Sequence, residues 1–278
     1  MTLFSWSWLF LVIYVGGMLV LGYLASKRVK SADEYATARG GYGPFFLALA
    51  FAATTASGAT FLGGPGLAYQ YGTAVLWGML YPFGVYFGLL ICIRLVTKAG
   101  HRFADRSIPE FLGDRYGSDG IRVLVAIFSL ALFFYLAGQL VSGLVMFEIM
   151  LGLPPAWALG ITTVVLLLYV TMGGAHADIL TDGVQGFIML LLAVLIIVLF
   201  LTGSGVVGGL SGLIDNLRAQ DPTLVGLLNP TTPLYHSWWS MAAWVIAVVP
   251  LGLLPHIGNK IWALEHDRDR IRFVKYAF

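Results

Sequence analysis

The sequence has few charged residues and a single cysteine. Asp, Glu, Lys and Arg make up 11% of its 278 residues, whereas a soluble domain carries about 25%. This shortage, together with 59% hydrophobic residues, excludes an ordinary soluble domain and predicts an all-α integral membrane protein. The one cysteine, Cys92, excludes an internal disulfide, and a net charge of +2 does not favour a nucleic-acid partner.

Long apolar runs fill most of the chain. Each is near or above the ~20 residues that a helix needs to cross a lipid bilayer. We count seven runs, at 6–26, 45–71, 73–97, 120–150, 155–173, 180–203 and 237–263. The sequence therefore predicts about seven transmembrane helices in a multi-pass protein of the cell membrane.

The basic residues are sorted between the loops. Of the 16 Lys and Arg, 15 lie in or at the edges of loop 27–44, loop 98–119 and the tail after segment 237–263. The exception is Arg218, in loop 204–236. Because basic loops stay on the cytoplasmic side, the N-terminus is predicted outside and the C-terminus in the cytoplasm.

Segment 45–71 is unsuited to a plain membrane helix at its centre. It contains the hydroxyl residues Thr54, Thr55, Ser57 and Thr60, and then the helix-weakening residues Gly63, Gly64, Pro65 and Gly66. Irregular backbone at membrane depth is tolerated only where protein encloses it or lines a cavity. The pattern favours a broken helix at a binding site, although small residues also occur where two helices pack tightly.

Segment 237–263 has the same peculiarity. Pro250, Gly252, Pro255 and Gly258 interrupt it about halfway along. The two broken segments lie five segments apart, so they cross the membrane in opposite directions. This arrangement is expected of an inverted-repeat transporter whose solute and ion bind between two discontinuous helices.

Two other classes of membrane protein are disfavoured. A membrane-embedded enzyme would need clustered catalytic groups. The HExxH motif is absent, and His176, with Asp178 and Asp182, lies at a membrane boundary without a third metal ligand in register. A seven-helix receptor, or another membrane protein without transport activity, fits the predicted topology and stays as the alternative. The two mid-membrane breaks argue against it.

Four short motifs, in this order along the chain, resemble the sodium:solute symporter family. They are Ala32-Asp33-Glu34-Tyr35 followed by Gly40-Gly41; Ala56-Ser57-Gly58 through Gly64-Pro65-Gly66; Gly173-Gly174 with Asp178 and Thr181-Asp182-xx-Gln185; and Pro255-His256 with Lys260. The resemblance covers nearly the whole chain. It implies a LeuT-like fold, in which one leading helix precedes two inverted five-helix repeats.

The resemblance also implies how the chain is divided. Residues 1–278 form a single transmembrane transporter domain, with 6–26 as the leading helix, 45–203 as the first repeat and 237–278 as the start of the second. Core helices 1 and 6 are the broken ones. Because the family needs about ten core helices, we expect further C-terminal helices in the same polypeptide or from a second chain. One wall of the family's sodium site lies on the eighth core helix, beyond this sequence.

The implied activity is sodium-coupled uptake of a small organic solute by alternating access, and not enzyme catalysis. The motifs are most similar to the branch that handles carboxylates such as pantothenate or short monocarboxylates. No cofactor is implied apart from Na⁺ as coupling ion, and the expected partners are the solute, sodium and the lipid bilayer. No intramembrane Lys or Arg offers itself to pair with a substrate carboxylate, apart from the positive ends of the helix dipoles.

The resemblance assigns sodium ligands near the first break. It implies that the backbone carbonyls of Ala53 and Ala56 face the ion, and that Asp182 has a cation-linked role. Sodium is a hard cation that prefers oxygen ligands, which an unwound helix supplies without a formal charge. The alternatives are ordinary helical alanines, and an aspartate that stabilises a helix N-terminus.

Six residues are predicted to bind or surround the solute, namely Thr55, Ser57, Thr60, Gln139, Gly252 and Pro255. The three hydroxyls lie beside the first break, although they could instead bond to carbonyls of the preceding turn. Gln139 is a mid-span amide whose partner is either the solute or the backbone of another helix. Gly252 and Pro255 are expected to shape the second break.

Overall fold

The computed structural model describes residues 3–202 and 205–278, and this part of the chain is helical without a β-strand. The α-helices are α1 (Leu3–Ser26), α2 (Ala32–Thr37), α3 (Pro44–Thr55), α4 (Gly64–Tyr71), α5 (Tyr81–Phe103), α6 (Ile108–Tyr116), α7 (Asp119–Ser129), α8 (Leu132–Leu151), α9 (Pro155–Leu201), α10 (Gly209–Gln220), α11 (Trp238–Ala247), α12 (Pro255–Gly258) and α13 (Arg270–Ala277). Shorter turns are the π-helical η1 (Ala59–Gly63) and the 3₁₀ elements η2 (Gly72–Leu80), η3 (Pro222–Val225), η4 (Val249–Leu253), η5 (Asn259–Ala263) and η6 (Asp267–Asp269). The all-helical prediction is confirmed.

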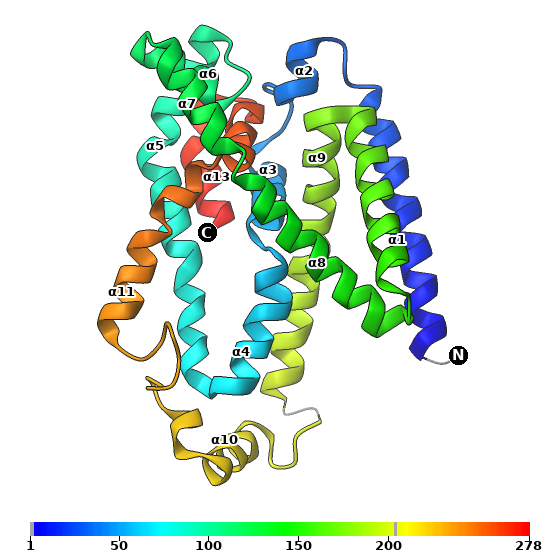
Figure 1. Ribbon diagram of the computed structural model, residues 1–278, viewed down its shortest axis with the longest axis vertical. Helices are drawn as coiled ribbons and strands as arrows, with labels where there is room; N and C mark the ends of the chain where they lie inside the picture. Colours follow the sequence, from blue (N-terminus) through cyan, green and yellow to red (C-terminus); the bar gives the residue numbers. More distant parts are fainter. Residues whose placement is uncertain (1–2, 203–204) are drawn as a thin grey trace.

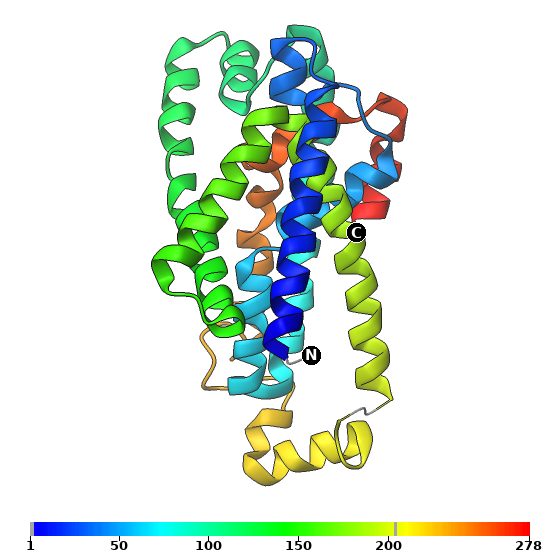
Figure 2. The ribbon, with the colours of Figure 1, turned by 90° about the vertical axis from the view of Figure 1, so that its right-hand side faces the viewer.

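The long helices run side by side along the long axis of the molecule (Figures 1 and 2). One end holds α2, α6 and the start of α7, and the opposite end holds α10. The loops that carry 15 of the 16 basic residues all belong to the first end. The terminal helix α13 enters the bundle from that end and packs on α3 and α5.

Helix α9 is a hairpin of two antiparallel arms, not one straight rod (Figure 2). The chain reverses at Gly174, whose φ of 52° and ψ of −134° lie outside the helical region. A Cβ there would lie 2.3 Å from the carbonyl oxygen of Tyr35. Only glycine both adopts this positive φ without strain and leaves the space beside Tyr35 free of a Cβ. The predicted segments 155–173 and 180–203 therefore belong to the two arms of this hairpin, and the chain reverses between them at one glycine.

Within residues 3–202 and 205–278, four helical stretches are long and apolar enough to cross a membrane, namely Leu3–Ser26, Thr60–Lys98, Asp119–Leu151 and Pro155–Leu201. A fifth candidate is the pair Trp238–Gly252 and Pro255–Ala263, bent by 58°. The hairpin within α9 contains two of the predicted segments, and α3 is a separate, shorter apolar helix. The number seven remains a prediction, whereas several apolar helices and a break in segment 237–263 are observed.

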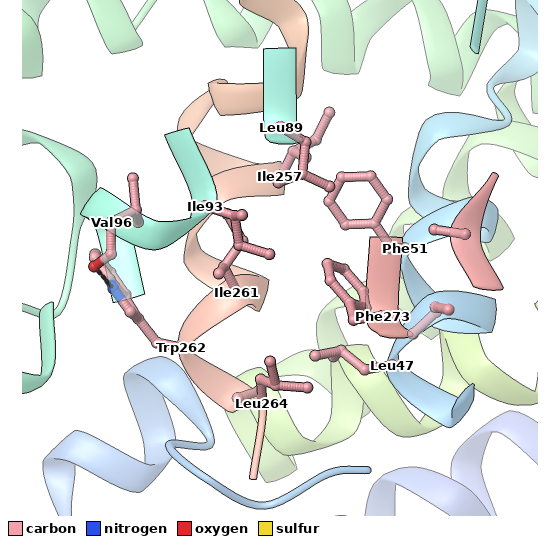
Figure 3. Close-up of a cluster of buried hydrophobic side chains, with 14 of the residues drawn as sticks. Leu47, Phe51, Leu89, Ile93, Val96, Ile257, Ile261, Trp262, Leu264 and Phe273 are labelled. Atoms are coloured by element: carbon pink, nitrogen blue, oxygen red, sulfur yellow. Dashed lines mark hydrogen bonds between the residues drawn. The ribbon is translucent and has the colours of Figure 1, made fainter. Parts of the chain in front are cut away.

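The largest cluster of buried side chains lies toward the end of the bundle with α2 and α6, and joins α3, α5, η5 and α13 (Figure 3). Phe51 of α3 meets Phe273 of α13 edge to face, with ring centroids 5.5 Å apart. Trp262 is fully buried and donates its indole N–H to the Val96 carbonyl at 3.0 Å. The second broken helix is therefore held to the first by a packed core.

Glycines bring α5 close to the second broken helix. A Cβ on Gly88 would lie 1.9 Å from the Val249 carbonyl oxygen, and one on Gly252 would lie 2.3 Å from the Val85 carbonyl oxygen. Backbone therefore meets backbone on both sides of this contact. Small residues permit such close approach between membrane helices, and they fix η4 against α5.

Arg39 ties together three segments at the end that holds α2. Its guanidinium binds both carboxylate oxygens of Asp33 at 2.9 and 3.0 Å, and donates to the backbone carbonyls of Gly100 at 3.0 Å and Asp105 at 2.6 Å. The next residue, Gly40, donates its amide to the Trp262 carbonyl at 3.0 Å. The connection between α2 and α3 is thus bonded to the ends of α5 and η5.

Asp105, beside Arg39, has a buried carboxylate without a hydrogen-bond donor among the described residues. The residue is 2% exposed, and both of its carboxylate oxygens are buried. Burial, followed by the neighbouring carboxyl groups of Asp114 and Glu110, raises the pKa of Asp105 to about 7, against a weaker lowering by Arg39. The carboxyl therefore titrates near neutral pH at the junction of α5 and α6.

Candidate functional site

The first broken helix is interrupted where the sequence predicted. Helix α3 ends at Thr55, Ala56 has φ of −79° and ψ of 93°, and the chain resumes as the π turn η1 at Ala59. The Gly58 amide, which in a regular helix would bond to the Thr54 carbonyl, binds a side chain of α8 instead. The Thr60 amide binds the Ser57 carbonyl at 2.8 Å and not that of Ala56. Backbone carbonyls are thereby released from the helical ladder.

Gln139 of α8 supports this break. Its Oε1 accepts a hydrogen bond from the Gly58 amide at 2.7 Å. Gly58 also packs too closely on α8 for a larger residue, because a Cβ there would lie 2.4 Å from the Ser142 hydroxyl oxygen. Of the two partners considered for Gln139, the backbone of another helix is the one observed.

A cavity of about 360 Å³ opens beside the break. Both sides of the break and one face of α8 line it, with Ser57, Gly58, Leu62, Gly63, Phe134, Tyr135, Gly138, Gln139 and Ser142. Tyr135 stacks on His256 of α12, with ring centroids 5.5 Å apart. The two broken helices therefore both approach this cavity, and it contains Ser57 and Gln139 from the predicted solute-binding set.

The other predicted solute residues lie apart from the cavity lining. Thr55 donates its hydroxyl to the Ala52 carbonyl at 3.0 Å, which is the bond to a preceding turn considered above. Thr60 is exposed, and Gly252 is buried against the backbone of α5. Pro255 begins α12 directly after Leu254, whose ψ of 144° breaks the helix. Gly252 and Pro255 thus flank the second break.

A buried cation lies beside the last turn of α3, just before the first break. The Lys260 ammonium of η5 is 2.5 Å from Asp182 Oδ2 and 2.9 Å from Asp178 Oδ2, both on α9. It also donates to the Thr54 hydroxyl at 2.5 Å, and Thr54 lies 2.6 Å from the same Asp182 oxygen. The side chain of Lys260 is 4% exposed. Three elements, α3, α9 and η5, therefore converge on one ammonium.

The sequence singles out Lys260 as part of the Pro255-His256 motif and places it at the cytoplasmic edge, but it does not predict the burial of the side chain or its contacts with Asp178 and Asp182. The available signal was its position inside the apolar run that continues through Ile261, Trp262 and Ala263, all of which are fully buried. A charged residue within such a run is seldom exposed to lipid and usually has a partner.

The predicted sodium ligands lie close to this cation. Ala53 is in the last turn of α3, where carbonyls lack intrahelical donors, and Asp182 contacts Thr54, the next residue. Among the residues that the structure describes, no three His, Cys, Asp or Glu side chains group as metal ligands. A sodium site here would have to combine backbone carbonyls with Asp182 and hydroxyl oxygens.

The sequence is similar to that of known sodium symporters and proline transporters. Residues 35–274 match the family model described as Sodium:solute symporter family. The chain is 30% identical to the osmoregulated proline transporter OpuE of Bacillus subtilis over 264 residues, covering 92% of this chain and 52% of that protein. It is 31% identical to the sodium/pantothenate symporter of Escherichia coli over 256 residues, covering 88% and 50%. The chain thus spans about half the length of the curated relatives it matches.

The fold also matches a solved structure. A Na⁺-coupled sialic acid symporter in a substrate-bound, outward-open state superposes with a TM-score of 0.78. The match covers 100% of this chain and 57% of that one, at 20% sequence identity. The likeness shows that the helices of this chain follow the same fold.

Proposed function

The chain belongs to the sodium:solute symporter family, and we propose that it forms part of a carrier that couples sodium entry to the uptake of a small organic solute. The observation that carries this proposal is the interrupted helix at 56–58, held open by Gln139 beside a cavity of about 360 Å³. An interrupted membrane helix supplies backbone groups to a solute and an ion.

The solute binds at the cavity beside the break. Gln139 uses its Oε1 to accept from Gly58, which directs its Nε2 donors elsewhere, and the Ser57 hydroxyl lies on the same cavity wall. Donors of this kind suit a carboxylate. Named relatives transport proline and pantothenate, which both carry a carboxylate. We therefore favour a small carboxylate solute, with Thr55, Thr60, Gly252 and Pro255 shaping the path around it.

Sodium binds next to the solute, at the released carbonyls of Ala53 and Ala56 and near Asp182. Thr54 supports this assignment because its hydroxyl contacts Asp182 and its neighbour Ala53 supplies one of the carbonyls. Lipid surrounds the exposed apolar faces of the helices. The basic end of the bundle faces the cytoplasm, which puts the N-terminus outside.

A complete carrier contains a second half, in the same polypeptide or in a second chain. The lengths of the relatives support this, since the chain covers 46–52% of OpuE, the proline transporter PutP of Bacillus subtilis and the Escherichia coli pantothenate symporter. In this arrangement residues 45–203 form the first repeat and 237–278 begin the second. The second half closes the cavity and completes the sodium site.

Uptake by the complete carrier in proteoliposomes tests this function. Radiolabelled proline and pantothenate are offered under an inward sodium gradient, with choline or potassium in its place as control. We expect uptake of at least one of them, or of a related carboxylate, only with sodium. Asp182→Asn should weaken the sodium dependence. Uptake that proceeds equally without sodium would contradict the proposal.

A further inference from the structure

Each N–H group of the Lys260 ammonium has a hydrogen-bond acceptor. An ammonium has three N–H donors, and the structure supplies three acceptors, Asp178 Oδ2, Asp182 Oδ2 and Thr54 Oγ1. Buried residues on both sides of its sequence position, Ile257 and Ile261, prevent the side chain from reaching water easily. The ammonium is therefore a buried, hydrogen-bonded part of the site and not a solvated surface charge.

The charges at this place do not balance. Two carboxylates face one ammonium, which leaves an excess of one negative charge when both are ionised. Asp178 is 46% exposed and is solvated, whereas Asp182 is 17% exposed and depends on protein partners. A buried carboxylate with an incomplete counter-charge favours a further cation.

The ammonium and a sodium ion bound here would share the Asp182 carboxylate. Asp182 Oδ2 accepts from both Lys260 and Thr54, and Thr54 lies in the chain between the carbonyls of Ala53 and Ala56. Two cations at this short range repel each other strongly in a medium of low dielectric constant. Full contact of Lys260 with Asp182 and full sodium binding at Asp182 therefore exclude each other.

We propose that the Lys260 ammonium is a tethered cation that competes with sodium for Asp182 and moves toward Asp178 when sodium binds. The inference depends on the proposed function, because it concerns the sodium site of that carrier. It makes Lys260 a residue that lowers sodium affinity. Because the ammonium also connects α3, α9 and η5, its release from Asp182 links sodium binding to the second broken helix.

The test is a sodium titration of the complete carrier, purified in detergent, with no solute present. The melting temperature is followed by tryptophan fluorescence as NaCl replaces choline chloride at constant ionic strength. In Lys260→Gln the competitor is gone, so the half-saturating sodium concentration should fall about tenfold. In Lys260→Arg it should rise about threefold or more, because a guanidinium binds a carboxylate with two parallel hydrogen bonds. In a Lys260→Gln background, Asp182→Asn should abolish the gain.

The outcomes separate the two proposals. A wild-type carrier that shows no sodium-specific stabilisation contradicts the proposed function. A wild-type carrier that responds to sodium, with Lys260→Gln unchanged or weaker, contradicts only the competition. If Lys260→Gln does not melt cooperatively, Lys260→Arg still decides, because a half-saturating concentration equal to or below that of the wild type overturns the inference. A gain that persists with Asp182→Asn overturns it as well.

Discussion

The side-chain carbonyl of Gln139 accepts a hydrogen bond from the Gly58 amide at 2.7 Å, and through this bond α8 supports the break in the first core helix. The bond replaces one that a continuous helix would make within itself. It explains how an interrupted backbone is stable in this place, since an unpaired buried amide is costly. The variants considered next are all made in the complete carrier.

Gln139→Leu should destabilise the break and impair uptake. The substitution removes the acceptor and leaves the Gly58 amide without a partner, at a cost of about 1–3 kcal/mol. Ser142→Ala is the matched control on the same cavity wall, because the Ser142 hydroxyl donates to Gly138 of its own helix. Thermal melting and uptake should both change for Gln139→Leu and little for Ser142→Ala. Equal effects of the two variants would count against the role of Gln139.

Gly58→Ala should damage the carrier for steric reasons. The new Cβ would lie 2.4 Å from the Ser142 hydroxyl oxygen and 2.5 Å from the Ser142 Cβ, and such overpacking costs about 1–3 kcal/mol. Gly138→Ala is the control, because a Cβ at Gly138 meets nothing within 4 Å. Uptake lost in Gly58→Ala should return in part when Ser142→Gly is added. If the double variant melts cooperatively but does not recover uptake, the close contact between Gly58 and Ser142 is refuted.

Gly88→Ala should separate α5 from the second broken helix. The Cβ would lie 1.9 Å from a backbone oxygen, that of Val249, so no side-chain rotation relieves the clash. We expect a loss of about 2 kcal/mol or more in stability. Gly16→Ala in α1, where a Cβ meets nothing within 4 Å, should be neutral or slightly stabilising. Melting curves that do not distinguish the two variants would contradict this packing.

The stability of the carrier should depend on pH through Asp105. Its pKa in the folded protein is raised to about 7 from an ordinary value of 3.8. The unfolded carboxyl therefore loses its proton first, and the contribution of Asp105 to stability, complete below about pH 4, declines as pH rises to about 7 and then stays constant.

Asp105→Asn removes this titration. The variant should have a higher melting temperature than the wild type at pH 8 and a flatter profile between pH 5 and 8. Asp119→Asn, at a side chain that is 91% exposed, should keep the wild-type profile. A wild-type melting temperature that does not change between pH 5 and 8, or an Asp105→Asn variant that is less stable than the wild type at pH 8, would show that burial does not raise the pKa of Asp105 to about 7.

The sequence predicted the breaks but not all of their contacts. Glycine and proline in segments 45–71 and 237–263 weaken a helix by local chemistry, so both interruptions were visible without a structure. The contacts of Lys260 were not, because its partners Asp178 and Asp182 are about 80 positions away and only the fold brings them together. The partner of Gln139 was likewise left open between solute and backbone. The sequence ended segment 155–173 next to Gly174, where the chain does reverse, but only the structure shows that this one residue with positive φ makes the whole reversal.

Cysteine labelling at position 57 tests most directly whether the break binds sodium and solute. Cys92 is the one cysteine of this sequence, so Ser57→Cys in a carrier with Cys92→Ala, and with any cysteine of the second half also replaced, gives a single thiol on the cavity wall. The rate of reaction with a small maleimide is measured with sodium, with the transported carboxylate, and with both. We expect strong protection only when both sodium and the carboxylate are present. Labelling at the same rate under all three conditions would contradict it.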